Sequence, residues 1–82
     1  IAGINNGTAS LLYGKLLVDA ESDYCNEVLG VKYLNIACEA GVAEAYYCLG
    51  KLYEEGFGVM QDDAKAEELF AKAAELGYEV KD

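Results

Sequence analysis

The chain has 82 residues, of which 54% are hydrophobic and 26% are charged, so it has room for one small folded domain or for two units of a longer repeat array. Its formal net charge is −9 at pH 7, and it contains no arginine, which excludes nucleic acid as an expected partner and leaves a protein or peptide, in particular a basic one. No apolar run reaches the roughly 20 residues of a membrane span, and nothing in the sequence indicates a compartment.

The first half of the chain predicts two helices. The first spans about residues 8–19, and a loop over about residues 20–25 follows it. The second spans about residues 27–40, with Asn26 as its N-cap. Gly41 follows at the place where a glycine commonly ends a helix in the left-handed conformation.

The second half predicts two more helices. One spans about residues 43–55 and is interrupted by Gly56-Phe57-Gly58. The other begins at a cap formed by Asp62 or Asp63 and ends near Leu76, before Gly77. No segment shows the alternation of apolar and polar residues that is typical of a β-strand, so the sequence predicts an all-α fold.

Both later helices carry a small and apolar stripe at helical spacing. In the third helix the stripe consists of Ala45, Leu49, Leu52, Tyr53 and Gly56, and in the fourth of Ala66, Leu69, Phe70, Ala73 and Gly77. The alanines allow the helix axes to approach closely, and the larger side chains fill the remaining space. These stripes are therefore the predicted core.

The two halves are related by a shift of 36 residues. Seven positions are identical, namely Ala9/Ala45, Gly14/Gly50, Lys15/Lys51, Leu16/Leu52, Ala37/Ala73, Glu39/Glu75 and Gly41/Gly77. Composition alone would give roughly four identities, so the count is weak evidence. The kind of residue is better evidence, because most matches are small or apolar and fall where two helices would touch. A recurrence of this length is typical of stacked helix hairpins, which mostly bind other proteins.

A candidate binding strip lies opposite the predicted core stripes. Equivalent helices of stacked repeats line one wall, so the strip combines six positions of the first and third helices: Leu11, Lys15, Val18, Tyr47, Lys51 and Glu54. Exposed Leu11 and Tyr47 beside repeated lysines would suit a protein or peptide ligand, since tyrosine offers a large contact area at a low entropy cost. The alternative is that Tyr47 and Leu11 pack against an adjacent repeat.

The sequence predicts no cofactor or metal site. It has no histidine, and its three cysteines, Cys25, Cys38 and Cys48, lack the Cys-x-x-Cys spacing of zinc sites. Cys38 and Cys48 flank the predicted turn between two helices, so a disulfide between them and two free core thiols both remain open.

The second half resembles the Sel-one-like repeat, a relative of the tetratricopeptide repeats. The resemblance rests on Ala45-x-x-x-Leu49-Gly50-x-x-Tyr53-x-x-Gly56-x-Gly58-Val59-x-x-Asp62-x-x-Lys65-Ala66, followed by Lys72-Ala73-Ala74-x-x-Gly77. It implies an α/α superhelix (solenoid) of two antiparallel helix-hairpin repeats, with the first helix of each pair on the concave wall. It also implies an adaptor that assembles protein complexes.

The resemblance divides the chain into a degenerate repeat over residues 7–42 and a well-matched repeat over residues 43–78. Residues 1–6 are expected to end a preceding unit or to form a cap, and residues 79–82 to begin a following unit or a tail. The first repeat has Ala20 and Ser22 in place of the loop glycines, which makes the geometry of that loop uncertain. Gly30 replaces an alanine and is expected to weaken the second helix by ~1 kcal/mol.

Two other functions compete with a protein-binding scaffold. The first is an enzyme, because one cysteine-rich branch of the family is linked to weak β-lactam binding or hydrolysis. Cys38 matches a cysteine of that branch, but Ala9 and Ala45 occupy the partner positions. The best catalytic candidates are then Cys25, Asp62 and Asp63; no histidine is present to activate the thiol, and the aspartates are better explained as helix caps. The sequence therefore predicts no enzyme.

The second alternative is a purely architectural segment. Stacks of this kind usually need about three repeats for stability. Two repeats alone would leave apolar ends exposed, so either a longer parent array covers these ends or the chain self-associates through them.

Overall fold

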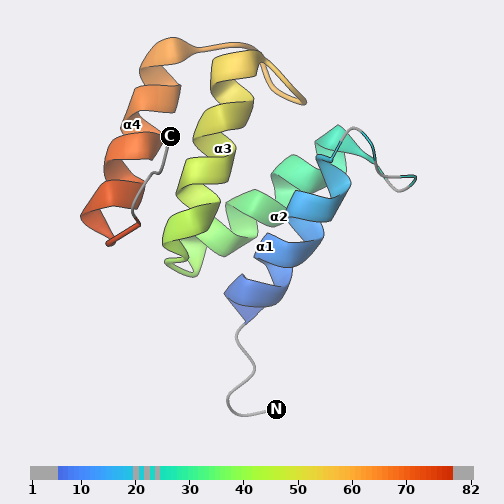
Figure 1. The fold of residues 1–82 in the computed structure, drawn as a ribbon, viewed down its shortest axis with the longest axis horizontal. Coiled ribbons are helices and arrows are strands. Elements are labelled where there is room, and N and C mark those ends of the chain that lie inside the picture. Colours follow the sequence, from blue (N-terminus) through green and yellow to red (C-terminus); the bar gives the residue numbers. More distant parts are fainter. Residues whose placement is uncertain (1–5, 20, 22, 24, 79–82) are drawn as a thin grey trace.

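Four α-helices make up the folded part of the chain. The computed structural model describes residues 6–19, 21, 23 and 25–78. Within these residues the helices are α1 (Asn6–Leu17), α2 (Glu27–Glu39), α3 (Ala43–Glu55) and α4 (Asp63–Glu75), and they contain no strand. Helix α1 packs against α2, α3 packs against α4, and α2 joins the two hairpins by packing against α3 (Figure 1). The predicted all-α stack of two helix hairpins is confirmed.

The helix ends follow the predicted capping residues. The Asn26 side chain accepts a hydrogen bond from the Leu29 backbone N–H, and Asp62 does the same for Lys65, each at 3.1 Å. Of the two aspartates considered as caps, Asp62 is therefore the N-cap and Asp63 is the first helical residue. These side chains satisfy backbone donors that have no partner within the helix.

Gly41 and Gly77 end α2 and α4 in the same way. Both have positive φ, +84° and +97°, a conformation that costs glycine little. The following residue returns a hydrogen bond to the last turn, from Val42 N–H to the Ala37 carbonyl at 3.1 Å and from Tyr78 N–H to the Ala73 carbonyl at 2.9 Å. The repeat therefore recurs in backbone geometry as well as in sequence.

Helix α1 differs from the predicted range. It runs over Asn6–Leu17 rather than about 8–19, because its last turn tightens into a bond from the Asp19 N–H to the Leu16 carbonyl. The Asn26 N–H then bonds the Leu17 carbonyl at 2.7 Å and directs the chain into α2. Ala20 and Ser22, where the loop geometry was uncertain, lie outside the described residues.

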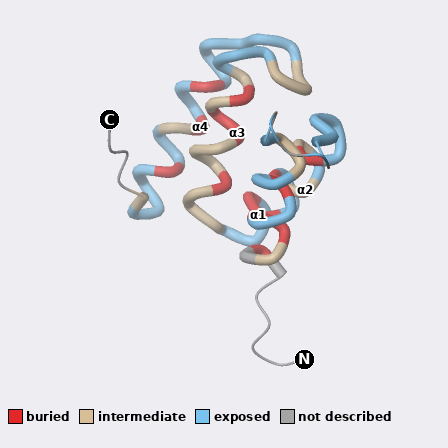
Figure 2. Tube along the Cα trace, turned by 45° about the vertical axis from the view of Figure 1, so that its right-hand side comes forward, coloured by how far each residue is buried: buried red, intermediate tan, exposed pale blue. Residues whose placement is uncertain are grey.

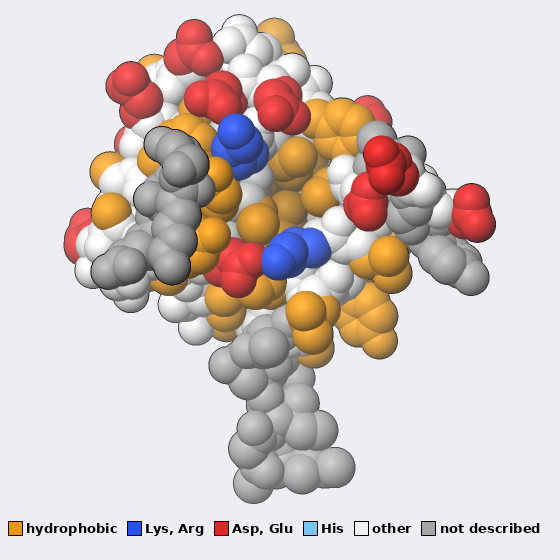
Figure 3. Space-filling model, viewed as in Figure 1, with side chains coloured by type: hydrophobic (Ala, Val, Ile, Leu, Met, Phe, Trp, Pro, Cys, Tyr) orange, Lys and Arg blue, Asp and Glu red, His pale blue; other side chains and the backbone are white. Residues whose placement is uncertain are grey.

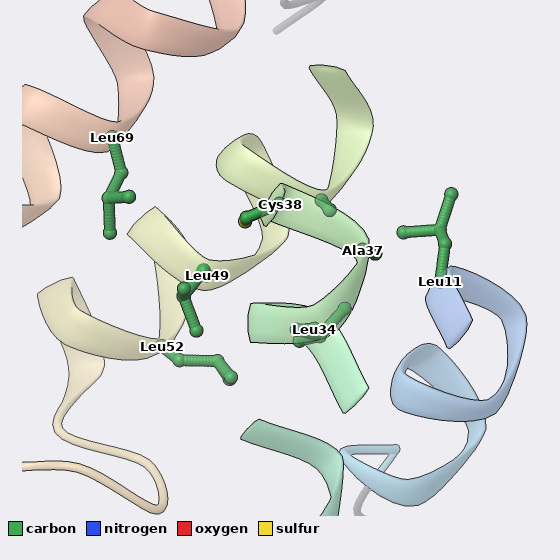
Figure 4. Packing of buried hydrophobic residues seen from close by; sticks show 8 residues of the cluster. Leu11, Leu34, Ala37, Cys38, Leu49, Leu52 and Leu69 are labelled. Carbon is green, nitrogen blue, oxygen red and sulfur yellow. The ribbon is translucent and has the colours of Figure 1, made fainter. Parts of the chain in front are cut away.

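The core lies between the two hairpins, along α2 and α3. It is a cluster of buried side chains: Leu11, Leu34, Ala37, Cys38, Ala45, Leu49, Leu52 and Leu69 (Figures 2 and 4). Ala66 and Ala73 are also buried. Six members of the predicted stripes are thus confirmed as buried: Ala45, Leu49, Leu52, Ala66, Leu69 and Ala73. Tyr53 and Phe70 are half-buried, and the prediction is wrong for Gly56 and Gly77, which are exposed.

Small residues set the distance between the helices of each hairpin. A Cβ atom added to Gly14 would lie 3.2 Å from the Gly30 carbonyl oxygen, and one added to Gly50 would lie 3.2 Å from the Ala66 carbonyl oxygen. A Cβ on Gly30 would meet Cγ1 of Val18 at 2.4 Å. The expectation that Gly30 only weakens α2 is therefore incomplete, because the glycine also makes room for Val18 where the helices cross.

Candidate functional site

The face formed by α1 and α3 carries the predicted strip, with one exception. Lys15 lies on α1 and Lys51 and Glu54 lie on α3, and about half of each of these side chains is exposed. Tyr47 and Val18 are half-buried. Leu11, in contrast, is only 6% exposed and belongs to the core.

The expected exposure of Leu11 is wrong. Its side chain packs in the cluster with Leu34 and Ala37 of α2, and α3 of the next repeat contacts α1 (Figure 4). Leu11 is thus buried against α2 of its own hairpin, and the alternative of packing against an adjacent repeat stays a prediction. Burial of a leucine in such a position contributes about 1.5–3 kcal/mol, which explains why it is not left on the surface.

Val18 is also held in place by packing. It contacts the core and fills the space opposite Gly30. Its counterpart 36 residues later is Glu54, which is exposed, and the counterpart of Gly30 is Ala66. The edge of the face is thus apolar in the first repeat and acidic in the second.

An ion pair joins the two repeats across this face. Lys15 Nζ lies 2.6 Å from Glu44 Oε2, between the last turn of α1 and the first turn of α3. The hydrogen bond to Glu44 is the main cause of the raised pKa of Lys15. Sequence reasoning missed Glu44, because its pairing with Lys15 spans 29 residues and arises only when one hairpin stacks on the other.

Lys51 is the repeat equivalent of Lys15 but has a different environment. It pairs with Glu54 on its own helix, with 3.5 Å between Nζ and Oε1, and the charge of Glu54 is the main cause of its raised pKa. The residue 36 positions after Glu44 is Val80, which cannot form an ion pair and lies outside the described residues. The two lysine side chains are about equally exposed, but Lys51 has the longer and therefore weaker ion pair, which a ligand carboxylate can replace more easily.

Three aromatic rings lie together at the end of this face. The ring centroid of Tyr47 is 5.5 Å from that of Phe70 and 5.1 Å from that of Tyr78. The pKa of Tyr78 is raised, first by burial and then by the charge of Glu44. Tyr78 was missed as well; its position in the first repeat is taken by Val42, so the recurrence contained no sign of an aromatic residue there.

The α1/α3 face therefore combines lysines, carboxylates and an aromatic surface. The space-filling view shows two lysine side chains near its centre, apolar side chains around them, an acidic side chain beside one of the lysines and further acidic groups towards its rim (Figure 3). Such a mixture can hold a peptide by apolar contact and by charged hydrogen bonds.

The candidate catalytic groups do not form an arrangement for nucleophilic catalysis. All three cysteines are free thiols, so the structure contains no Cys38–Cys48 disulfide. Burial raises the pKa of Cys38 to about 12 and also raises that of Cys48, which keeps both thiols protonated at neutral pH. Cys25 is exposed, and Asp62 serves as a helix cap.

Two other structural findings concern metals and membranes. Among the described residues, no group of three or more His, Cys, Asp or Glu side chains is placed to hold a metal ion. Within the same part of the chain, no helix has both the length and the apolar character needed to cross a membrane.

The fold and its recurring close contacts define a protein of stacked helix hairpins, a tetratricopeptide-like α/α repeat. A family model named Sel1 repeat matches twice, at residues 9–42 and 43–78. The chain belongs to the Sel1 repeat family, whose members generally mediate protein–protein interactions as non-enzymatic scaffolds. No curated protein and no solved structure matched the chain.

The roles of residues 1–6 and 79–82 as parts of neighbouring units stay predictions, and these segments fall almost wholly outside the described residues.

Proposed function

We propose that this chain is a scaffold or adaptor module that binds a protein or peptide segment across the α1/α3 face. The contact residues are Lys15, Val18, Tyr47, Lys51 and Glu54 of the predicted strip, without Leu11, and Glu44 and Tyr78 join them. The observation that carries the proposal is the position of Lys15 and Lys51 at equivalent places on the two helices, with the Tyr47 ring beside them on the same face.

Each part of the face supplies a different interaction. Tyr47 offers an aromatic surface that Phe70 and Tyr78 already hold in place, so little side-chain entropy is lost on binding. Lys51 offers a half-exposed ammonium group to a ligand carboxylate. Glu44 and Glu54 favour a ligand that also carries basic residues, in keeping with the net charge of −9.

Selection of peptides from a random display library against the intact chain would test this proposal. The selected peptides are then measured against a Tyr47→Ala/Lys51→Glu double variant and against Lys72→Glu. Lys72 is a matched control, because it is an exposed lysine in an i,i+3 pair with Glu75 on α4. We expect the double variant to lose most of the affinity and Lys72→Glu to retain it. Equal affinity of all three proteins would show that the peptides bind elsewhere.

A further inference from the structure

The charges of the α1/α3 face follow a symmetric order along α3. Glu44 lies in the first turn of α3, and its Oε2 atom is 2.6 Å from the ammonium nitrogen of Lys15. Glu54 lies in the last turn of α3, and its Oε1 atom is 3.5 Å from the ammonium nitrogen of Lys51. Lys51 precedes Glu54 by one turn. The two carboxylates therefore lie at the ends of α3, each with an ammonium group beside it.

The strip between the two ammonium groups is apolar. The α3 residues between Glu44 and Lys51 carry no charge, and Cys48 among them packs half-buried against the core. Burial is the main cause of the raised pKa of Cys48, the charge of Glu44 adds to it and that of Lys15 opposes it, so the Lys15 ammonium group lies close to this thiol. Cys48 also lies one turn before Lys51 on the same side of α3. The space-filling view shows apolar side chains between the two lysine side chains near the centre of the face (Figure 3).

The distance between the ammonium groups fits an extended chain. One ammonium group lies beside Glu44 and the other belongs to Lys51 and lies beside Glu54. Because α3 rises ~1.5 Å per residue, their separation lies between the ~10 Å from Glu44 to Lys51 and the ~15 Å from Glu44 to Glu54. In an extended strand alternate side chains point to one side, and residues about four positions apart are ~13 Å from each other. Two such residues reach both ammonium groups, and the residue midway between them lies over Cys48.

We propose that the α1/α3 face selects an extended segment whose inward-facing side chains follow the order basic, acidic, apolar, acidic, basic. The two carboxylates bind the ammonium groups of Lys15 and Lys51, which each have more than one N–H donor and so keep their own glutamates. The apolar side chain lies on Cys48, and the outer basic side chains reach Glu44 and Glu54. The charges of such a segment balance, so the net charge of −9 does not repel it. This charge order rests on the proposed function, for which it specifies the ligand.

Two synthetic peptides of identical composition test the charge order. One is Lys-Thr-Glu-Thr-Val-Thr-Glu-Thr-Lys with both ends blocked, and the other has its lysines and glutamates exchanged. Threonine and valine favour the extended conformation. In a calorimetric titration of the intact chain we expect the first peptide to bind about tenfold more tightly, because the exchange turns attraction into repulsion at every charged position. Equal affinities, or binding of neither peptide, would overturn the proposed order.

A matching exchange within the chain tests which residues read the order. The variant with Lys15→Glu/Glu44→Lys and Lys51→Glu/Glu54→Lys keeps the composition and allows both ion pairs, but it reverses the charge order of the face. We expect this variant to prefer the second peptide by a similar factor. Far-UV circular dichroism checks that its helix content equals that of the parent chain. An unchanged preference would overturn the assignment of the ligand charges to these four residues.

Lys72→Glu/Glu75→Lys is the matched control, since it exchanges the exposed ion pair of α4. It should retain the preference of the parent chain, and a reversed preference would show that the peptides bind α4 instead. The ligand class and the binding face can fail separately. Library peptides that depend on Tyr47 and Lys51 but lack this charge order would contradict the ligand class alone. Library peptides that bind without this dependence would contradict the binding face itself.

Discussion

Gly14 on α1 and Gly30 on α2 face each other so closely that a Cβ atom on either would lie 3.2–3.3 Å from the carbonyl oxygen of the other. In the second repeat only the residue on the first helix is a glycine, since Gly50 lies opposite Ala66. At the position of Gly30 the second repeat has Ala66, and at the position of Val18 it has Glu54. In the first repeat a Cβ atom on Gly30 would lie 2.4 Å from Cγ1 of Val18, so residues 18 and 30 are coupled.

This coupling predicts a non-additive pair of substitutions. Gly30→Ala gains helix propensity but places its methyl group against Val18, so we expect it to destabilise the protein. Combining it with Val18→Glu, which reproduces the second repeat, should cost less than the sum of the two single changes by about 0.5–3 kcal/mol. Urea denaturation of the four proteins of the cycle measures this energy, and additive free energies of unfolding would show that the two positions are independent.

Gly50→Ala tests the equivalent contact in the second repeat. The added methyl group would lie 2.7 Å from an atom of the Phe70 ring and 3.2 Å from the Ala66 carbonyl oxygen. The Phe70 ring packs against that of Tyr47 and the carbonyl is part of α4, so we expect a loss of about 1–3 kcal/mol in the free energy of unfolding. Glu55→Ala, at an exposed position of the same helix, is the control and should change stability by less than about 0.5 kcal/mol.

Ala73 is fully buried, and larger or charged residues should not fit at its position. We expect Ala73→Leu to cost about 1–3 kcal/mol through overpacking, and Ala73→Lys to cost more because the charge would be buried without a partner. The neighbouring Ala74 is exposed and provides the matched variant Ala74→Lys. A thermal unfolding midpoint that falls equally for Lys at both positions would contradict the packing described for α4.

The buried thiol of Cys38 predicts a loss of stability in alkali. Its pKa is about 12 in the folded state and 9.0 when unperturbed, so the unfolded chain releases the proton first as the pH rises. The protonated Cys38 thiol makes its full contribution to the free energy of unfolding below pH 9, and this contribution is lost as the pH rises from 9 to about 12. Replacing Cys38 by alanine should make the decrease in the free energy of unfolding over this range less steep. The exposed Cys25 is the control, and Cys25→Ala should leave the decrease unchanged.

Sequence periodicity was sufficient to predict the helices and the part of the core that α3 and α4 supply. The bounds of α3 were predicted correctly, since Gly41 and Gly56 mark its two ends and the small and apolar residues between them follow one face of a helix. The caps at Asn26 and Asp62 were also predicted, because each is a local interaction between a side chain and the next turn.

The stacking of one hairpin on the other could not be read from either repeat alone. The ion pair between Lys15 and Glu44 joins the two repeats, and its partners are 29 residues apart in the sequence. Leu11 was expected on the surface because its counterpart Tyr47 lies opposite the predicted stripe of the third helix, whereas packing against α2 of its own hairpin buries it. The contact between Tyr47 and Tyr78 forms within the second repeat, between residues far apart in the sequence.

Amide chemical-shift mapping with a selected peptide tests the proposed binding face most directly. The chain is labelled with ¹⁵N and titrated with a peptide obtained from the display library. We expect the largest shift changes at Lys15, Tyr47, Lys51 and Tyr78, with α4 beyond Phe70 little affected. Changes confined to the outer side of α4, around Lys72 and Glu75, would contradict it.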